Sequence, residues 1–299
     1  MPHRVAVDIG GTFTDFCVFD EATRSLATLK VLSRPDRPGA EILDGVSRLA
    51  ERGGTRPGDI AFFTHGTTVG VNTVIQRKGA TLALFVTEGF EDVLALARLK
   101  VPDPYDLFSR RPDPLAPRER TWGVRERLLK DGSAATPLDP ESVRAATREA
   151  VAAGAEAVVV AFLHSYANGA HERAARELIL ETAPGMSVTL SSEVWPVIRE
   201  YERTVTATVA GYVQRRVADY LTALQAALAE AGVPATPMIG KSSGGMMSAE
   251  LGKTDPISML LSGTAAGVVG AADIAARIGA PDVLSFDVGG TSADVAVIR

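Results

Sequence analysis

Two stretches of this chain, Asp8-Ile-Gly-Gly-Thr-Phe-Thr-Asp15 and Asp287-Val-Gly-Gly-Thr-Ser-Ala-Asp294, repeat one pattern. In each copy an apolar run leads to an Asp, two glycines and a Thr, and a second apolar run follows the closing Asp. Apolar, glycine-rich and apolar segments in this order predict a strand, a tight turn and a second strand. The repeat therefore predicts two similar hairpins, around which the rest of the chain is interpreted.

The predicted turn has the chemistry of a phosphate site. Glycines lack a Cβ, so a phosphate can approach the backbone and accept hydrogen bonds from its N–H groups. A carboxylate at the end of the entering strand, Asp8 or Asp287, can hold Mg²⁺ directly or through water, and the Thr hydroxyl can reach a phosphate oxygen. One such turn is a weak signal, whereas two matching turns predict two lobes of similar build that close on one nucleotide.

Composition places the chain among ordinary globular proteins and argues against a nucleic-acid partner. Its 299 residues, 46% hydrophobic and 22% charged, are enough for two domains. The net charge of −5 implies no basic face, and the Arg-rich stretch from residue 110 to 130 is interrupted by acidic residues. That stretch predicts a solvated loop of mixed charge.

Cysteine use and hydropathy predict a cytoplasmic protein with no membrane partner. The single cysteine, Cys17, excludes an intrachain disulfide and fits a reducing compartment. The chain passes from residue 4 directly into the first predicted strand, so no signal peptide is expected. The longest apolar run, 157–163, is too short to span a bilayer.

Between the hairpins the apolar spacing alternates between the helical and the strand period. We predict helices at 40–52, 69–78, 89–100, 140–154, 170–182, 199–231 and 262–278, and strands at 60–63, 81–86, 157–163, 187–190 and 237–239. The run 157–163 is apolar on both faces, as in a parallel sheet. Alternating helices and strands predict a layered α/β fold.

Prolines 102, 104, 112, 114 and 117 predict a long ordered loop between residues 101 and 120. Such loops are often lids, so Tyr105, Asp106 and the preceding Arg98 are candidate substrate neighbours, with a plain surface excursion as the alternative. His164 and His171 lack further ligands nearby, which favours hydrogen bonding or capping over metal binding.

Three other polar loops are candidate binding elements. The stretch Thr64-His-Gly-Thr-Thr68 precedes a predicted helix, where backbone N–H groups can bind an anion or a polar substrate group. The alternative is that Thr67 or Thr68 only caps that helix. The small residues of 241–246 and 262–267 allow close approach of a ligand or of another backbone, and the sequence does not distinguish the two.

The doubled turn resembles the two phosphate loops of the actin, hexokinase and Hsp70-like ATPase superfamily. Within it, the longer string of motifs resembles the A-type subunit of the hydantoinase/oxoprolinase family. Thr264 stands where that family usually has proline, and family members continue past the second turn. The matching stretches occur in family order along essentially the whole chain, at 7–15, 64–68, 77–80, 87–93, 164–166, 171–172, 200–203 and 286–294.

The resemblance implies an α/β fold of ribonuclease-H-like lobes with the second lobe incomplete, so the chain is expected to be a fragment or a subunit completed by another polypeptide. It implies a hydantoinase/oxoprolinase-type lobe with the first phosphate loop at 1–185. The start of a hydantoinase A-type lobe with the second phosphate loop is expected at 186–299.

The resemblance also implies an ATP- and Mg²⁺-dependent hydrolase subunit. It would activate a cyclic amide (a hydantoin, 5-oxoproline or a related lactam) by phosphoryl transfer for ring opening, together with a B-type subunit or domain. Asp8 and Asp287 are the implied catalytic residues and metal ligands. The implied phosphate-binding residues are Gly10, Gly11, Thr12, Thr14, Asp15, Gly289, Gly290, Thr291 and Asp294, and the implied substrate neighbours are His65, Gly66, Thr67 and Thr68.

Three alternatives remain open at this point. One is an ATP-dependent ketone carboxylase subunit of the same family, and another is a small-molecule kinase of the same superfamily. The third is non-enzymatic: an actin- or chaperone-like ATPase that acts by lobe movement, against which the stretch 64–68 weighs, or a subunit that binds nucleotide without turning it over.

Overall fold

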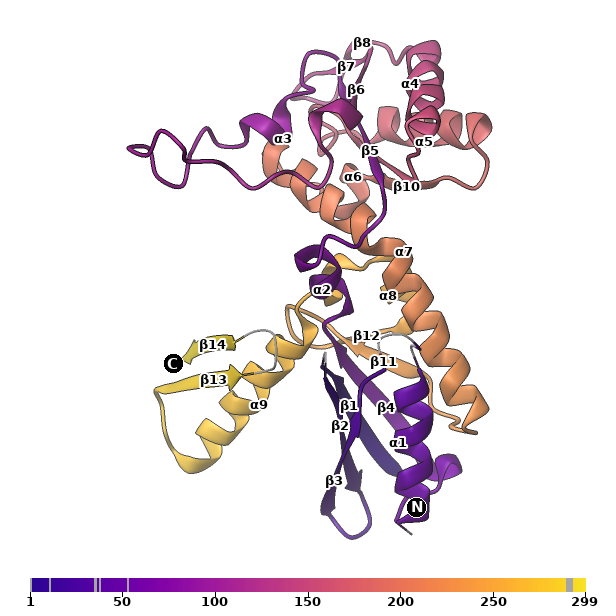
Figure 1. The fold of residues 1–299 in the computed structure, drawn as a ribbon, viewed down its shortest axis with the longest axis vertical. Coiled ribbons are helices and arrows are strands. Elements are labelled where there is room, and N and C mark those ends of the chain that lie inside the picture. Colours follow the sequence, from indigo (N-terminus) through magenta and orange to yellow (C-terminus); the bar gives the residue numbers. More distant parts are fainter. Residues whose placement is uncertain (1, 11, 35–36, 38, 53, 289–292) are drawn as a thin grey trace. The chain divides into compact units, whose positions relative to one another are not determined.

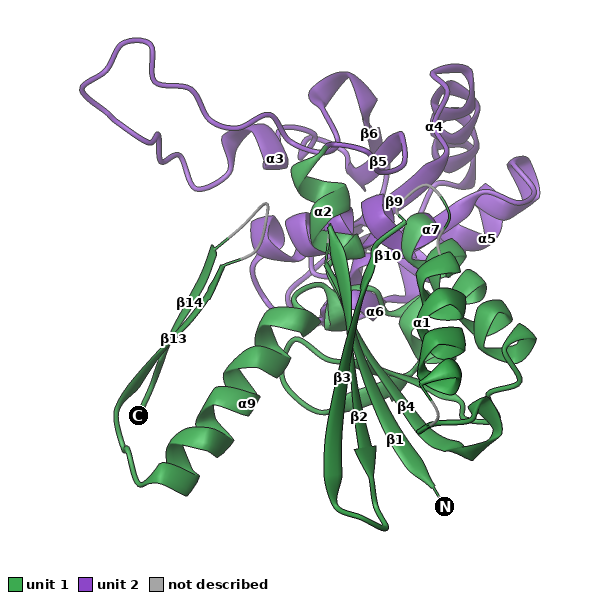
Figure 2. Cartoon of the chain, turned by 60° about the horizontal axis from the view of Figure 1, so that its bottom comes forward, with its two compact units in different colours: residues 1–76, 216–299 green, residues 77–215 purple. Residues whose placement is uncertain are grey.

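The computed structural model describes residues 2–10, 12–34, 37, 39–52, 54–288 and 293–299. The chain forms two compact units, unit 1 from residues 1–76 and 216–299 and unit 2 from residues 77–215 (Figure 2). The chain leaves unit 1 after residue 76 and returns within the long helix α7 (Glu200–Glu230). The boundary predicted at residue 185 separates two sequence domains that are defined by the order of their motifs. The spatial units divide the chain differently, since unit 2 is inserted into unit 1, so the boundary at 185 stays a prediction.

Unit 1 is built on a six-stranded sheet of order β12-β11-β4-β1-β2-β3 (Figure 1). Strands β1, β2 and β3 are antiparallel neighbours, β1 pairs parallel with β4, and β4 pairs parallel with β11. The strands are β1 (His3–Ile9), β2 (Phe13–Asp20), β3 (Ser25–Leu32), β4 (Ile60–Thr67), β11 (Pro237–Gly240) and β12 (Met246–Ser248).

The predicted second hairpin is a separate two-stranded ribbon in unit 1, formed by β13 (Val283–Val288) and β14 (Ala293–Ile298). In the two hairpins the motif carboxylates face each other in the same register, Asp8 with Asp15 and Asp287 with Asp294. The helices of unit 1 are α1 (Ala40–Glu51), α2 (Val69–Ile75), α8 (Ala249–Thr254), α9 (Ser262–Ile278) and the second part of α7 (Glu200–Glu230).

Unit 2 is a second α/β layer built on a four-stranded parallel sheet of order β10-β9-β5-β6. A short antiparallel pair, β7 and β8, lies beside it. Its strands are β5 (Leu82–Thr87), β6 (Thr121–Val124), β7 (Arg127–Leu128), β8 (Ala134–Thr136), β9 (Ala157–Ala161) and β10 (Ser187–Leu190). Its helices are α3 (Val93–Leu96), α4 (Pro140–Ala152), α5 (Ala170–Thr182), α6 (Ser191–Val194) and the first part of α7.

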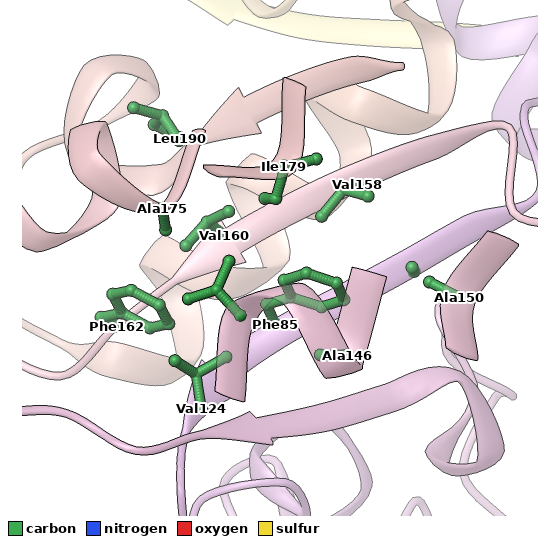
Figure 3. Close-up of a cluster of buried hydrophobic side chains, with 12 residues drawn as sticks. Phe85, Val124, Ala146, Ala150, Val158, Val160, Phe162, Ala175, Ile179 and Leu190 are labelled. Atoms are coloured by element: carbon green, nitrogen blue, oxygen red, sulfur yellow. The ribbon is translucent and has the colours of Figure 1, made fainter. Parts of the chain in front are cut away.

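The core of unit 2 explains why β5 and β9 read as continuous apolar runs. Every residue of both strands is buried, and α4 and α5 pack onto the sheet. Figure 3 shows Phe85, Val160 and Phe162 meeting Val124 and Ile179 in one cluster. A parallel sheet covered in this way has apolar residues on both faces, as predicted for 157–163.

One predicted helix is wrong. The stretch 89–100 forms only the single turn of α3, which ends at Ala97 with a positive φ of 49°. The Arg111 guanidinium donates hydrogen bonds to the carbonyls of Ala95, Leu96 and Lys100, which a continued helix would use for its own N–H groups. The predicted long loop follows and is confirmed up to the 3₁₀ turn Arg118–Arg120.

Helix α7 runs unbroken through Gly211, a position where the sequence allowed either a break or a close packing contact. No helix within the described ranges has the length and apolarity needed to cross a bilayer.

Candidate functional site

A cavity of about 650 Å³ lies in unit 1 beside the carboxyl end of β1. It is lined by residues of four sequence regions that the fold brings together, namely the first hairpin with β3 and β4, the loop after β11, the first turns of α9, and β13. These are Ala6, Val7, Asp8, Asp15, Phe16, Cys17, Thr28, Thr64, His65, Gly66, Gly240, Lys241, Gly244, Gly245, Met246, Ser262, Gly263, Ala265, Ala266, Gly267, Val269 and, from β13, Asp287.

The Asp8 carboxylate occupies a space that two glycines leave open. Asp8 lies opposite Gly66 in the β1–β4 register. A Cβ on Gly66 would approach Asp8 Oδ1 to 3.3 Å, and a Cβ on Gly263 would approach the same oxygen to 3.4 Å. Side chains at these two positions would crowd the carboxylate, so Gly66 and Gly263 give it room.

Burial raises the pKa of the Asp8 carboxyl above its ordinary value, and the negative charges of Asp15 and Asp287 raise it further. Asp15 has a partner, because Lys30 Nζ lies 3.1 Å from its Oδ1. A carboxylate whose charged form is disfavoured by two neighbouring carboxylates favours a bound cation. The donor set at Asp8 and Asp287 therefore fits a divalent metal ion.

The cation would need ligands from elsewhere as well. Within the described residues, no group of three or more His, Cys, Asp or Glu side chains is arranged to hold a metal ion. Mg²⁺ is usually held by one or two carboxylates and completes its octahedral shell with water and phosphate oxygens. The site thus fits Mg²⁺ that arrives with a phosphate ligand better than a metal held by protein side chains alone.

Other residues of the cavity wall suit an anion. Lys241 lies in a tight turn in which its N–H donates to Gly245 O at 3.0 Å and its carbonyl accepts from Gly244 N at 3.1 Å. The first turn of α9 contributes Gly263 and Ala265, small residues that leave the helix start accessible. An ammonium group and backbone N–H groups at the start of a long helix are the donors that phosphate oxygens prefer.

His65 anchors the end of β1 from a buried position. Its Nδ1 lies 3.2 Å from Val7 O and its Nε2 lies 2.5 Å from the Tyr220 hydroxyl on α7. Burial lowers the pKa of His65 to about 4, so the ring is neutral at pH 7. Burial also raises the pKa of Tyr220, which stays protonated. A neutral ring that donates from Nδ1 to Val7 O accepts the Tyr220 proton at Nε2.

The other predicted substrate neighbours are joined to α9 and to the start of α2. The Thr67 side chain is buried, its N–H lies 3.2 Å from Ser262 Oγ, and its hydroxyl accepts the N–H of Val69 at 3.1 Å. The Thr68 hydroxyl accepts from the Asn72 amide at 3.0 Å. Thr67 thus accepts the first N–H of α2 from the position before the N-cap, while the N-cap residue Thr68 makes no side-chain capping hydrogen bond.

The structure brings some predicted site residues together and leaves others apart. Asp8, Asp15, Asp287, His65 and Gly66 line the cavity, whereas the lining set does not include Gly10, Thr12, Thr14, Thr67, Thr68 or Asp294. The buried Thr14 hydroxyl pairs with Ser33 Oγ at 2.9 Å. Gly11, Gly289, Gly290 and Thr291 lie outside the described residues.

Sequence reasoning did not assign Lys241 or the start of α9 to the site. The small residues of 241–246 and 262–267 indicated close approach, but to a ligand or to a backbone. Only the parallel pairing of β11 with β4 places both loops beside Asp8, and these strands are far apart in sequence. The predicted hydrogen-bonding role of His171 is confirmed, since its Nδ1 lies 2.7 Å from Glu126 Oε2.

Comparison with protein families matches the chain in two consecutive parts. Residues 4–183 match the hydantoinase/oxoprolinase N-terminal region, and residues 203–299 match the hydantoinase/oxoprolinase model. Together they cover the chain in the order that its motifs predicted.

Similar proteins include both carboxylases and a lactamase. The acetophenone carboxylase gamma subunit of Aromatoleum aromaticum is 35% identical over 99% of this chain and 42% of its own. The solved nucleotide-free acetone carboxylase superposes with a TM-score of 0.90 at 29% identity, over 99% of this chain and 44% of that one. The ATP-dependent caprolactamase of Pseudomonas jessenii gives a TM-score of 0.87 at 29% identity, over 98% and 43%. The chain thus spans less than half the length of these relatives, and its α/β lobes match theirs.

Proposed function

The chain belongs to the hydantoinase/oxoprolinase family, and from this premise we propose that it is part of an ATP-dependent hydrolase subunit acting on a cyclic amide. The substrate class is a hydantoin, 5-oxoproline or a related lactam. The observation that carries the proposal is the cavity that combines Asp8 and Asp287 with Lys241 and the start of α9. A solved relative is an ATP-dependent caprolactamase, and caprolactam is a cyclic amide.

An amide carbonyl is a poor electrophile, and phosphoryl transfer to its oxygen makes the carbon attackable by water. In this step the bond from the γ-phosphorus to the amide oxygen forms, the bond to the β-phosphate oxygen breaks, and ADP leaves. Water then adds to the carbon and the ring C–N bond breaks, which leaves a ring-opened amine that carries an acyl phosphate. A second water hydrolyses the acyl phosphate to a carboxylate and inorganic phosphate. Most of the catalysis of phosphoryl transfer comes from positioning and charge stabilisation.

The residues of the chain divide this work between cation and anion binding. Asp8 and Asp287 would hold Mg²⁺, which when bound neutralises charge on the transferring phosphate. Lys241 and the N–H groups at the start of α9 would bind phosphate oxygens. The two turns would add backbone and hydroxyl donors, namely Gly10, Gly11, Thr12, Thr14, Asp15, Gly289, Gly290, Thr291 and Asp294.

The stretch 64–68 would border the substrate. Gly66 lies at the cavity beside Asp8, and we assign it the closest approach. His65 and Thr67 hold that segment in place through contacts with Tyr220 and Ser262. They would therefore position the substrate indirectly, by fixing the backbone of Gly66. A B-type subunit or domain would carry out the hydrolysis of the activated amide, and a reducing cytoplasmic location is part of the proposal because Cys17 is the only cysteine.

The test is ATP turnover by the full-length protein with a panel of lactams, with and without the B-type subunit. We expect lactam-dependent release of inorganic phosphate together with a ring-opened product. Absence of nucleotide binding, or binding with no response to any lactam, would contradict the proposal.

A ketone carboxylase is the second candidate, favoured by the likeness to the acetophenone and acetone carboxylases. In that reaction ATP activates a ketone and bicarbonate, so substrate consumption would require bicarbonate. Ketone consumption that depends on bicarbonate, with no ring opening of any lactam, would select the carboxylase. A stable phosphorylated product would indicate a small-molecule kinase instead.

A further inference from the structure

A second cavity, of about 720 Å³, lies in unit 2 between α3 and the start of α7. Figure 1 shows the first turns of α7 beside α3. Its wall is built by residues between Gly89 and Arg98, by Leu163, and by residues 198–201, and none of these described residues also lines the cavity at Asp8. A volume of this size is typical of sites that bind small molecules.

The cavity lies where the topology of unit 2 favours a ligand site. Strands β5 and β9 are parallel neighbours in the sheet order β10-β9-β5-β6. The chain continues from β5 to β6 on one side and from β9 to β10 on the other, so the connections diverge between β5 and β9. Gly89 follows the end of β5 and Leu163 follows the end of β9. Open α/β sheets bind ligands at the carboxyl ends of strands whose connections diverge in this way.

Three stretches of the sequence that the proposed function leaves unused meet at this cavity. The stretch 87–93 contributes Phe90 and Val93, the stretch 200–203 contributes its first two residues, and the stretch 164–166 directly follows Leu163. Backbone strain gathers here as well. Ala97, with a φ of 49°, and Arg199, with a φ of 109°, both line the cavity. Residues other than glycine keep such angles only where the surrounding structure holds them, and these places are often ligand sites.

Two charged side chains of the wall already have partners. Arg98 forms two hydrogen bonds with Glu202, of 2.8 and 2.6 Å, and Asp92 Oδ1 accepts a hydrogen bond from Arg118 at 2.8 Å. The guanidinium of Arg199, in contrast, forms no hydrogen bond or ion pair within the part of the chain that the structure describes. An unpaired guanidinium at a cavity wall is suited to bind a carboxylate through two parallel hydrogen bonds.

Glu200, the next residue, contributes a carboxylate that also lacks hydrogen bonds. Its Oε1 is buried and has no hydrogen-bond partner among the described residues. This oxygen lies 3.7 Å from Nη2 of the buried Arg203 and 3.8 Å from His164 Nδ1, which is too far for a hydrogen bond to either. The Glu200 side chain is 31% exposed and lines the cavity, so a ligand can reach the carboxylate. A ligand N–H group would supply a hydrogen bond that the carboxylate lacks.

Most of the remaining wall is apolar. Phe90, Val93 and Leu96 come from the segment around α3, and Leu163 and Ile198 come from the ends of β9 and of the segment before α7. Phe90, Leu96 and Ile198 are exposed in this structure. A hydrocarbon chain placed against these side chains would remove apolar surface from water on both sides.

We propose that this cavity binds an α-amino acid with an aliphatic side chain. Arg199 binds the α-carboxylate, Glu200 accepts hydrogen bonds from the α-ammonium group, and the apolar wall covers the side chain. An α-amino acid carries its two charges on one carbon, which matches two charges presented by consecutive residues. A carboxylate without an ammonium group would bring its charge close to that of Glu200, whereas an amine without a carboxylate would bring its charge close to that of Arg199. A zwitterion satisfies both residues.

A comparison of ligands on the wild-type protein tests the proposed chemistry. The full-length protein is titrated calorimetrically, without nucleotide, with L-leucine and with three analogues. Isocaproate lacks the ammonium group, isopentylamine lacks the carboxylate, and L-alanine lacks most of the side chain. We expect L-leucine to bind at one site, at least about tenfold more tightly than each analogue. This comparison needs no variant, so its result does not depend on the folding of one.

A comparison of variants locates the site. Arg199→Gln and Glu200→Gln are compared with Arg148→Gln, which alters an exposed arginine that pairs with Glu141 on α4 of the same unit. We expect the Kd for L-leucine to rise at least about tenfold in the first two variants and to change less than about twofold in Arg148→Gln. Arg199→Gln should bind L-leucine and isopentylamine with similar affinity, because it no longer recognises the carboxylate. Glu200→Gln should likewise lose the preference for L-leucine over isocaproate.

The contrary results are equally specific. The site is overturned if L-leucine does not bind the wild type at concentrations up to about 10 mM, or if its Kd is the same in Arg199→Gln, Glu200→Gln and the wild type. Isocaproate that binds the wild type as tightly as L-leucine would exclude an amino acid as the ligand. The proposed function stands or falls separately, since L-leucine binding without any Mg·ATP binding would refute that function and support this site.

Discussion

The two hairpins of this protein share one sequence pattern and one register, yet their side chains have opposite surroundings. In the first hairpin, Val5 is fully buried and Val18 is 2% exposed, because β4 and β3 pair on either side and α1 packs nearby. The residues at the same motif positions of the second hairpin, Leu284 and Val297, are both 66% exposed. The motif therefore specifies a hairpin with facing carboxylates, and neighbouring strands decide whether it becomes a core.

The two motif carboxylates do not share this contrast, because Asp8 and Asp287 both lie on exposed positions of their strands. Asp8 lies beside Gly66 and Gly263, and its pKa is raised by desolvation and by the charges of Asp15 and Asp287. A carboxylate whose charged form is disfavoured in this way gains from a nearby cation, which a metal–nucleotide complex would supply.

The largest expected difference is between Asp8→Asn and Asp287→Asn. Asp8→Asn should lower ATP turnover of the full-length protein at least about 100-fold, since it removes a preorganised charge. It should also raise Tm, because it removes a charge that desolvation and two neighbouring carboxylates disfavour. Asp287→Asn should lower turnover and change Tm less, because the strands of the second hairpin are far more exposed than those of the first. Differential scanning fluorimetry and a phosphate-release assay measure both effects, and a lower Tm for Asp8→Asn would be inconsistent with the account.

His65 on β4, which lies against Val7 of the first hairpin, gives unit 1 a dependence on pH. Its pKa is about 4 when folded and about 6.5 when unfolded, so the unfolded chain binds the extra proton first as the pH falls. The stabilisation is complete above pH 6.5 and is lost as the pH falls toward 4, by about 3 kcal/mol in total. Urea unfolding from pH 7 to 4 should show this loss in the wild type and a smaller one in His65→Gln. If the free energy of unfolding fell equally with pH in the two proteins, His65 would not be the cause of the pH dependence.

A matched pair of valines tests the burial contrast directly. Val18→Ala should destabilise the protein by about 2 kcal/mol because it leaves a small cavity in the sheet core. Val297→Ala, at the equivalent position of the ribbon, should change the free energy of unfolding by less than about 0.5 kcal/mol. Urea midpoints of the 299-residue chain measure both. Similar losses for the two variants would mean that the ribbon is packed as firmly as the first hairpin.

The smallest expected effect concerns the space beside Asp8. Gly66→Ala places a Cβ 3.3 Å from Asp8 Oδ1 and should weaken Mg·ATP binding about 3- to 10-fold, roughly 1 kcal/mol. Gly270→Ala on α9 is the control, since no atom lies within 4 Å of its new Cβ. The control should leave binding unchanged and raise Tm slightly, because alanine favours a helix over glycine. Equal binding by the wild type and Gly66→Ala would show that the carboxylate tolerates a closer neighbour.

The sequence predicted the local structure well and the site only in part. The glycine-rich turns predicted the two hairpins, and the spacing of apolar residues predicted most helices and strands. The helix predicted at 89–100 does not form in full, because Arg111, more than ten residues away in sequence, binds carbonyls that a longer helix would use. Lys241 was missed because its place depends on the pairing of β11 with β4. The burial of His65 likewise depends on Tyr220, which lies 155 positions further along the chain.

The central claim is that the cavity at Asp8 binds a metal–nucleotide phosphate, and calorimetric titration of the full-length protein with Mg·ATP tests it most directly. The wild type is compared with Asp8→Asn and with Asp44→Asn, which alters an exposed ion pair on α1. We predict one site in the wild type and in Asp44→Asn, with Kd raised at least about 30-fold in Asp8→Asn. Binding by Asp8→Asn within about twofold of the wild type, or no binding by any of the three, would contradict the claim.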